Sequence, residues 1–213
     1  WAPCPKVRRM LTSVSNGPGR EIGVFGGTFD PPHVGHLAIA LDVRHVLGLD
    51  EVWFVVAGDP WQKSGERSIT PASIRLAMVE AAVGEVDGLQ VSTLEIDRGG
   101  PSYTADTLTG LAAAYAADTF HLIIGSDAAV GLDTWHRPDV VAELAKLVVV
   151  DRGGREGGRP PEGWSYELVD VPALEVSSSD LRRRVADGAP IRGLVSAGVA
   201  DVIDAHDLYR ESS

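Results

Sequence analysis

The chain is poor in cysteine, in long apolar runs and in positive charge, and each shortage excludes a class of protein. Cys4 is its only cysteine, so no disulfide can form within the chain, which fits a reducing compartment. No apolar run approaches the roughly 18 residues that a membrane helix needs. The formal net charge of −11 argues against a general nucleic-acid binder, which usually presents a basic face. We therefore expect a cytoplasmic protein with neither a membrane nor a nucleic acid as partner.

The length of 213 residues suits one domain with a sizeable core. Residues 1–20 are rich in proline, glycine, serine and basic side chains, without periodicity and without the apolar core of a signal peptide. We expect residues 1–20 to form a mobile tail and residues 21–213 to form a single domain.

Apolar runs and helical patterns alternate along the chain. Short continuous apolar runs are typical of strands buried on both faces, and apolar residues at helical spacing are typical of helices. The pattern predicts strands at 22–25, 51–57, 89–96, 120–124 and 146–150, with helices at 37–47, 71–84, 104–115 and 138–145. Such alternation predicts an α/β fold with a doubly wound parallel sheet. Ligands of these sheets bind at the carboxyl ends of the strands. The glycine- and proline-rich stretch 151–164 is expected to be a flexible surface loop.

A glycine-rich turn and two histidines follow the first expected strand, in the sequence Gly-Val-Phe-Gly-Gly-Thr-Phe-Asp-Pro-Pro-His-Val-Gly-His over residues 23–36. Glycine lets a backbone approach a phosphate closely, and a helix N-terminus offers free N–H groups to an anion. His33 and His36 would lie one turn apart at that helix end. The segment has neither the Gly-x-Gly-x-x-Gly of dinucleotide-binding folds nor the lysine of a P-loop. It predicts a nucleotide triphosphate site; the alternatives are a plain surface turn and a zinc site, for which no third ligand stands near.

A second helix start, Val-Ser-Ser-Ser-Asp-Leu-Arg-Arg-Arg at residues 176–184, has the serines of an N-cap. Its N–H groups and hydroxyls could contact phosphate oxygens, and Arg182, one turn into the helix, could add a charge-assisted hydrogen bond. The alternative is an ordinary capped helix with a solvated basic face. Either way, the fold gains a helical part toward the C-terminus.

Two further segments have weaker signals. The turn Gly99-Gly100-Pro101 leads into a helix that we expect Ser102 or Thr104 to cap. Asp127, at the carboxyl end of an expected strand, could bind a ribose hydroxyl, and Trp135 could stack on a flat ring. Taken alone, the first segment is an ordinary strand-to-helix connection and the tryptophan is more often a packing residue.

Residues 26–36, Gly-Gly-Thr-Phe-Asp-Pro-Pro-His-Val-Gly-His, resemble the signature of the nucleotidyltransferase superfamily marked by His-x-Gly-His. Within it, the chain resembles the bacterial nicotinate-nucleotide adenylyltransferases from about Glu21 to Tyr209. Residues 176–182 resemble the family's Ile-Ser-Ser-Thr-x-x-Arg element, with valine for isoleucine and Ser179 for threonine. The segment 58–63, Gly-Asp-Pro-Trp-Gln-Lys, is similar to the actinobacterial branch, keeping Lys63 but departing at Trp61-Gln62 from the Pro-Pro-His-Lys of many relatives.

The resemblance implies a Rossmann-like nucleotidyltransferase fold and an enzyme of NAD biosynthesis. Its reaction transfers the adenylyl group of ATP, bound with Mg²⁺, to nicotinate mononucleotide, giving deamido-NAD and pyrophosphate. It implies catalytic roles for His33, His36, Lys63 and Arg182. It implies ATP contacts at Gly26, Gly27, Thr28, Phe29, His33, His36, Gly125, Asp127, Ser178, Ser179 and Arg182. It implies contacts to the nicotinate nucleotide at Tyr103, Thr104, Trp135 and Lys63, and no protein ligand to a metal.

Other functions stay open at this point. The acceptor could be nicotinamide mononucleotide or phosphopantetheine, although short phosphopantetheine enzymes lack so long a C-terminal part. The Arg-Thr-x-Gly-Ile-Ser-Thr element of cytidylyl transferases is absent. A nucleotide-binding sensor without catalysis would be favoured if His33, His36, Lys63 or Arg182 were missing, and all four are present. A monomer and a homo-oligomer are both compatible with the sequence.

Overall fold

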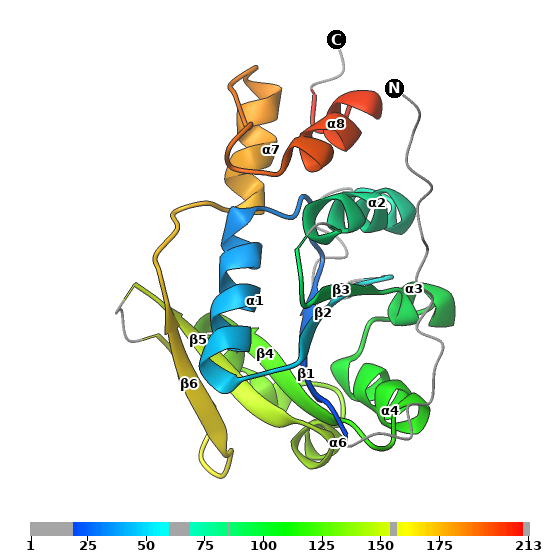
Figure 1. The fold of residues 1–213 in the computed structure, drawn as a ribbon, viewed down its shortest axis with the longest axis vertical. Helices are drawn as coiled ribbons and strands as arrows, with labels where there is room; N and C mark the ends of the chain where they lie inside the picture. The colour runs from blue at the N-terminus through cyan, green and yellow to red at the C-terminus, as the bar shows by residue number, and fades with distance from the viewer. Residues whose placement is uncertain (1–18, 60–68, 85, 154–156, 211–213) are drawn as a thin grey trace.

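The computed structural model describes residues 19–59, 69–84, 86–153 and 157–210, in which six strands form one sheet (Figure 1). The strands are β1 (Glu21–Gly27), β2 (Glu51–Val56), β3 (Leu89–Ser92), β4 (Thr119–Gly125), β5 (Lys146–Arg152) and β6 (Tyr166–Val171). Their order is β3-β2-β1-β4-β5-β6, and every neighbouring pair is parallel. The strand order reverses between β1 and β4, where ligands of open α/β sheets bind. The predicted doubly wound α/β fold is confirmed.

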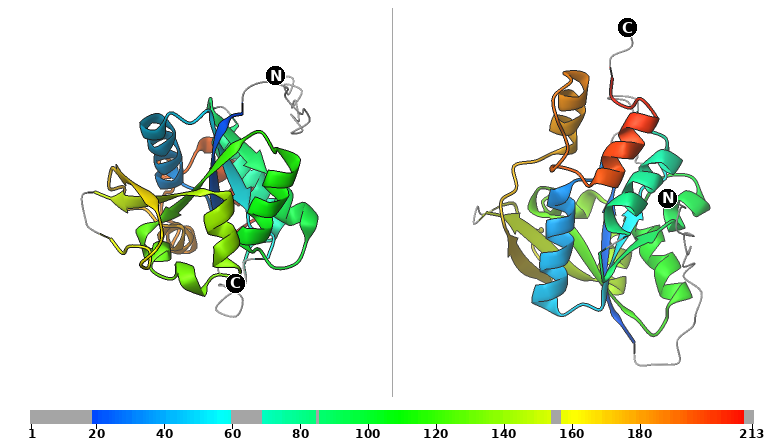
Figure 2. Two further views of the ribbon diagram at one scale, coloured as in Figure 1. Left: turned by 90° about the horizontal axis from the view of Figure 1, so that it is seen from below. Right: turned by 45° about the horizontal axis from the view of Figure 1, so that its top comes forward.

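Helices cover both faces of the sheet and extend beyond one end of it. They are α1 (Val34–Leu47), α2 (Ala72–Val83), α3 (Leu94–Arg98), α4 (Thr104–Ala114), α5 (Ser126–Ala129), the 3₁₀-helix η2 (Leu132–Thr134), α6 (Pro138–Leu144), α7 (Ser178–Ala186) and α8 (Ala197–Ala205). Figure 2 shows α7 beyond the end of α1 and α8 beside α2. Helices α7 and α8 are the predicted C-terminal helical part. The described residues include no helix that is both long and apolar enough to cross a membrane.

Two apolar clusters, one on each face of the sheet, form the core. Along β2, Phe54 and Val56 enter the cluster shared with α1, α2, α7 and α8, while Trp53 and Val55 enter the cluster shared with α4 and α6. All four side chains are at most 1% exposed. Because neighbouring residues of a strand point to opposite faces, an uninterrupted apolar run is what this doubly covered strand requires.

The expected strand at 89–96 is wrong beyond Ser92, since α3 begins at Leu94. The Ser92 hydroxyl oxygen accepts a hydrogen bond from the backbone N–H of Leu94 (3.4 Å), and the Thr93 hydroxyl donates to Asp97 (2.6 Å). Serine, threonine and aspartate compete in this way with a strand ladder and favour helix starts. The alternation of apolar and polar residues in the sequence continues beyond Ser92, so this pattern alone predicts too late an end for the strand.

Other boundaries also differ from the predictions. Helix α2 begins at Ala72 with Pro71 as its N-cap, one residue later than expected. The N-cap of α4 is Tyr103, without a side-chain cap, rather than Ser102 or Thr104. Strand β6 was not predicted at all, because only Val169 and Val171 of its six residues are buried and its pattern reads as polar.

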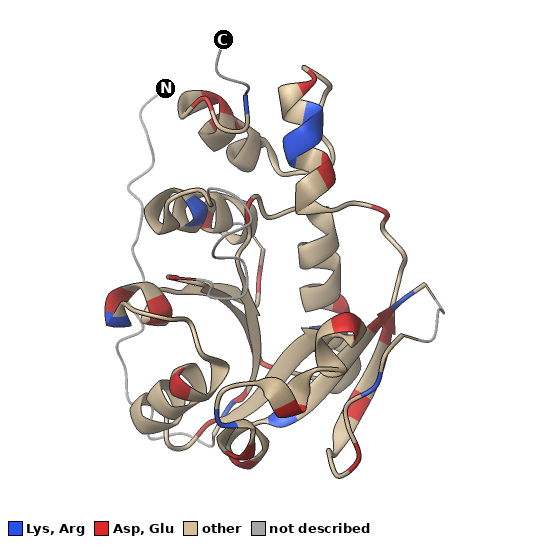
Figure 3. Ribbon diagram, turned by 180° about the vertical axis from the view of Figure 1, so that it is seen from behind, with Lys and Arg blue, Asp and Glu red and all other residues tan. Residues whose placement is uncertain are grey.

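The predicted tail and loop are described only in part. Residues 1–18 of the tail lie outside the described residues, and Arg20 is hydrogen-bonded to Asp118 through its side chain. In the glycine-rich stretch, β5 extends to Arg152, and Arg159 forms an ion pair with Asp151 (2.8 Å). In the ribbon of Figure 3, positions of Asp and Glu are spread over many elements, in keeping with the negative net charge.

Candidate active site

The first of the predicted phosphate-binding helices, α1, begins at its N-cap His33, and His36 lies in its first turn. The backbone N–H of His33 donates to Nδ1 of His36 (3.1 Å). A neutral imidazole has one donor and one acceptor nitrogen, so this bond fixes the His36 proton on Nε2. The first amide of the helix, that of Val34, is already bound to the Leu194 carbonyl (3.0 Å). The His36 side chain is therefore a donor that this helix end can offer to an anion.

His33 differs from His36 in its burial. It is 7% exposed, and its ring lies 3.8 Å from the His36 ring, centroid to centroid, at 30°. Burial lowers the pKa of the His33 imidazole to about 4, and the charge of Arg152 acts in the same direction, so His33 is neutral near pH 7. A Cβ at Gly35 would lie 3.0 Å from His33 Nδ1 and 3.2 Å from Val176. Glycine between the histidines therefore makes room for the His33 ring.

The second of the predicted phosphate-binding helices, α7, is hydrogen-bonded directly to the loop that precedes α1. Ser178 donates its hydroxyl to the Pro31 carbonyl (2.8 Å), and Arg182 donates from Nη1 to the Asp30 carbonyl (2.8 Å). The second Arg182 nitrogen, Nη2, donates to the Ser179 hydroxyl oxygen (2.9 Å). The structure thus brings the two motifs together although about 150 residues separate them along the chain.

The C-terminal segment also holds this loop. Tyr209 donates its phenol proton to the Asp30 carboxylate (2.6 Å) and lies 3.5 Å from the Thr70 hydroxyl. Burial, followed by the negative charge of Asp30, raises the pKa of the Tyr209 phenol, so it stays protonated and donates. The loop between β1 and α1 is therefore fixed by α7 and by the chain that follows α8. Arg75 of α2 holds it from a third direction, through the Thr28 carbonyl.

A cavity of about 250 Å³ lies at the carboxyl ends of β1 and β4, as expected for this fold. Its lining contains seven of the predicted site residues, Gly26, Gly27, Thr28, Tyr103, Thr104, Gly125 and Trp135. Trp135 is half-buried and also packs against the core on this face. The cavity therefore unites the predicted ATP turn with the predicted nicotinate loop.

The N-terminus of α4 opens onto this cavity. Tyr103 is its N-cap, and the backbone N–H groups of Thr104 and Ala105 have no hydrogen-bond acceptor within the described part of the chain. Unpaired N–H groups at a helix N-terminus, together with the helix dipole, favour an anion. A carboxylate fits this end of the cavity.

Sequence reasoning missed three residues of this region. The ring of His136 stacks on that of Tyr103 at 4.4 Å and 30°, and both line the cavity. Glu95, also in the lining and 7% exposed, accepts a hydrogen bond from Thr107 (2.6 Å). Arg75 of α2 is 1% exposed and donates to three backbone carbonyls around the site. Only the adjacency of His136 to Trp135 was visible in the sequence.

The cavity lining does not include the other predicted residues. The predicted residues at the starts of α1 and α7 lie outside it: His33, His36, Ser178, Ser179 and Arg182. Phe29 is 3% exposed and belongs to the core cluster with Phe54, and Asp127 is exposed in α5, so their predicted ATP contacts stay predictions. Lys63 falls outside the described residues. Among the described residues, no three His, Cys, Asp or Glu side chains gather in a way that could hold a metal ion.

The chain matches the model of the cytidylyltransferase-like family over residues 24–184. It is 44% identical over 193 residues, 90% of each chain, to a Saccharopolyspora erythraea protein named "Probable nicotinate-nucleotide adenylyltransferase". A Streptomyces coelicolor protein of the same name is 45% identical over 87% of this chain and 98% of its own.

Solved structures agree in fold. The nicotinic acid mononucleotide adenylyltransferase of Plasmodium falciparum complexed with NaAD has a TM-score of 0.72 at 20% identity, over 89% of this chain and 97% of its own. The same protein complexed with APC has a TM-score of 0.71 at 21% identity, over the same shares of both chains. The identity to these relatives over most of the chain shows that it belongs to the nicotinate-nucleotide adenylyltransferase family.

Proposed function

We propose that this chain transfers the adenylyl group of ATP to nicotinate mononucleotide, forming deamido-NAD and releasing pyrophosphate, as a cytoplasmic enzyme of NAD biosynthesis. The observation that carries the proposal is the single cavity shared by the glycine turn of β1 and the N-terminus of α4. One side of it suits a nucleotide phosphate and the other suits a carboxylate attached to a flat ring. The names of the relatives support the same reaction.

The nicotinate ring would lie against Trp135 with its carboxylate at the N–H groups of Thr104 and Ala105. A carboxylate offers acceptor oxygens to both groups. The carboxamide of nicotinamide mononucleotide offers one acceptor oxygen and one donor nitrogen, so one N–H group would face another donor. Leaving a buried hydrogen-bonding group unpaired is costly, and such a mismatch is an effective source of specificity.

The triphosphate of ATP would lie across the N-termini of α1 and α7. There the Nε2–H of His36, the N–H groups of Ser178 and Ser179, and the Arg182 guanidinium are its donors, and Lys63 is proposed as a further cation. Mg²⁺ would enter with ATP, held by the substrate and water rather than by protein side chains, and would neutralise part of the phosphate charge. The site has donor groups rather than a carboxylate cage, which fits a metal bound to the substrate.

The reaction then needs no enzyme nucleophile. A 5′-phosphate oxygen of the mononucleotide attacks the α-phosphorus of ATP, the new P–O bond forms, and the bond to the bridging oxygen breaks to release pyrophosphate. Catalysis comes from alignment of the two substrates and from donors aimed at the charge of the transferring group. His36, whose tautomer is fixed by the His33 amide, is proposed as the principal such donor.

A pyrophosphate-release assay tests this function. We expect turnover with ATP, Mg²⁺ and nicotinate mononucleotide, and a product with the mass of deamido-NAD. Activity only with phosphopantetheine would contradict the proposed acceptor. Nucleotide binding without pyrophosphate release from any acceptor would favour the non-catalytic sensor.

A further inference from the structure

Arg75 in α2 is a buried arginine that holds three chain segments at once. Its Nε donates to the Thr70 carbonyl (2.8 Å), Nη1 to the Thr28 carbonyl (2.9 Å) and Nη2 to the Gly58 carbonyl (3.3 Å). A guanidinium presents its donors in a rigid planar fork. The three carbonyls bound by that fork are therefore held at fixed positions relative to one another.

The Thr28 carbonyl belongs to the ATP side of the site. Thr28 follows the glycine pair that ends β1 and lines the cavity. Two residues later, the carbonyl of Asp30 accepts the hydrogen bond from Arg182. Through Nη1, Arg75 thus fixes the start of the loop whose end is held by α7.

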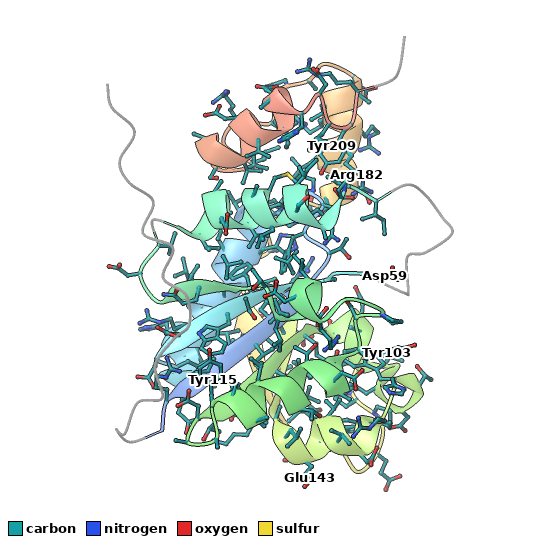
Figure 4. All side chains as sticks on the ribbon, turned by 90° about the vertical axis from the view of Figure 1, so that its right-hand side faces the viewer. Asp59, Tyr103, Tyr115, Glu143, Arg182 and Tyr209 are labelled. Atoms are coloured by element: carbon teal, nitrogen blue, oxygen red, sulfur yellow. The ribbon has the colours of Figure 1, made fainter. Side chains whose placement is uncertain are left out.

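The Gly58 carbonyl leads to the nicotinate side. The backbone carbonyl of the next residue, Asp59, accepts a hydrogen bond from the N–H of Ser102 (3.0 Å). The backbone N–H of Asp59 donates to the Ser102 hydroxyl oxygen (3.3 Å). Ser102 is followed by Tyr103, the N-cap of α4. Figure 4 shows Asp59 between Tyr103 on one side and Arg182 with Tyr209 on the other. Through Nη2, Arg75 therefore also holds the backbone that supports the nicotinate loop.

We propose that Arg75 is a positioning residue that sets the relative placement of the two substrate subsites, an inference that rests on the proposed adenylyl transfer. Each subsite keeps its own donors without Arg75, on α1 and α7 for the phosphates and on α4 for the carboxylate. In-line attack, however, depends on the distance and angle between the two bound substrates, and a displacement of about 1 Å can cost about a hundredfold in rate. Arg75 therefore acts on turnover more than on the binding of either substrate.

The test is Arg75→Lys, which keeps a positive charge and removes the planar fork. We expect kcat to fall by roughly tenfold to a hundredfold, while the KM of each substrate changes by less than about threefold, since neither loses its direct contacts. The matched control is Arg20→Lys, because Arg20 is held by Asp118 and Glu51 at the opposite edge of the sheet. That variant should keep the kcat of the parent enzyme. The thermal unfolding midpoints of both variants are measured first, and the kinetics are recorded well below them, where each variant is folded.

A second variant tests the Gly58 connection without removing the arginine. A Cβ at Gly58 would lie 2.9 Å from the Glu95 carbonyl oxygen, so Gly58→Ala must displace this backbone. We expect the same loss in kcat with little change in KM. If Arg75→Lys does not fold, the kcat of Gly58→Ala tests the positioning role in its place.

The outcomes separate the two proposals. A parent enzyme without activity on ATP and nicotinate mononucleotide contradicts the proposed function, and this inference with it. An active parent with unchanged kcat in folded Arg75→Lys overturns the positioning role alone, as does unchanged kcat in Gly58→Ala. A loss confined to the KM of one substrate also overturns it, because Arg75 would then serve one subsite only.

Discussion

The amino ends of the parallel strands, here called the amino edge of the sheet, and their carboxyl ends, the carboxyl edge, differ in what their polar side chains bind. At the amino edge, charged groups pair with one another: Arg20 with Asp118 (2.6 Å) and Glu51 (3.4 Å), and Lys146 with Glu21 (3.4 Å). At the carboxyl edge, side chains bind backbone carbonyls of loops, as Arg75, Arg182 and Ser178 do. The amino edge is thus linked by ion pairs, whereas at the carboxyl edge the loops are fixed in place and the first N–H groups of α4 stay unpaired within the described residues.

This difference explains how an acidic protein can bind two anionic substrates. The donors of the carboxyl edge are N–H groups at the starts of α4 and α7, the His36 side chain and an arginine anchored to a loop. Such local donors are fixed before a ligand arrives, which is the arrangement that stabilises charge in a transition state. The remote negative charge of the surface is screened over about 8–10 Å of salt solution. Mutations at the two edges should therefore separate activity from stability.

The largest effect is expected for His36→Ala, which removes the Nε2–H donor at the start of α1. We expect kcat to fall by roughly a hundredfold or more, as when one preorganised transition-state donor is lost, with the fold intact. His45→Ala is the matched control, because His45 is an exposed residue in the last turn of the same helix. Steady-state kinetics and circular dichroism measure both, and near-normal turnover of His36→Ala would remove it from the mechanism.

The next effect is a pH dependence of stability caused by His33. Its pKa is about 4 in the folded protein and about 6.5 in an unfolded chain. Between these values the unfolded state binds more protons, so the free energy of unfolding falls as the pH falls from about 6.5 to 4. The contribution lost by pH 5 is about 2 kcal/mol. Urea unfolding of the parent and of His33→Asn at pH 7 and pH 5 should show a smaller loss in the variant; equal losses would place the pKa of His33 near 6.5.

A smaller effect is expected for Trp135→Ala on the nicotinate side. Stacking of a base on an aromatic side chain contributes about 1–3 kcal/mol, and a single pyridine ring should lie in the lower part of that range. The KM of the mononucleotide should rise roughly five- to thirtyfold, and the KM of ATP should stay the same. Trp164→Ala is the control, since Trp164 is a half-buried tryptophan outside the cavity lining. Equal losses for both substrates would make Trp135 a packing residue.

The smallest effect on activity is expected at the amino edge. Asp118→Asn removes a carboxylate that is 4% exposed and bound to Arg20, which should lower the free energy of unfolding by about 1–2 kcal/mol. Because this pair is remote from the cavity, kcat and both KM values should equal those of the parent. Denaturant titration and kinetics on the same preparation give both numbers. A change in kcat would mean that the two edges are coupled.

The sequence predicted those parts of the fold whose signal is local. The buried strands β2 and β5 contain continuous apolar runs, and in β4 only His121 interrupts the run. The starts of α1 and α7 have glycine, histidine or serine at the positions that helix N-termini favour. Strand β6 was not predicted because it is an outermost strand of the sheet, in which only Val169 and Val171 are buried.

In the site, too, the sequence predicted the residues of local motifs and not those that act through contacts between segments. His36, Ser178 and Arg182 stand in local motifs. Arg75 resembles any solvated arginine of a helix in the sequence, because two of its three acceptors, the Thr28 and Gly58 carbonyls, come from other segments. The stacking of His136 on Tyr103 likewise depends on the packing of α6, which follows His136, against α4. Residues whose role consists of contacts between segments need the structure to be found.

If the N-terminus of α4 receives the carboxylate of nicotinate, the enzyme must distinguish the acid from the amide. The most direct test compares kcat/KM for nicotinate mononucleotide and nicotinamide mononucleotide with ATP and Mg²⁺. The donor facing the amide nitrogen should cost enough to make the acid better by about a hundredfold or more. Comparable kcat/KM values for the acid and the amide would contradict the assignment of this helix end.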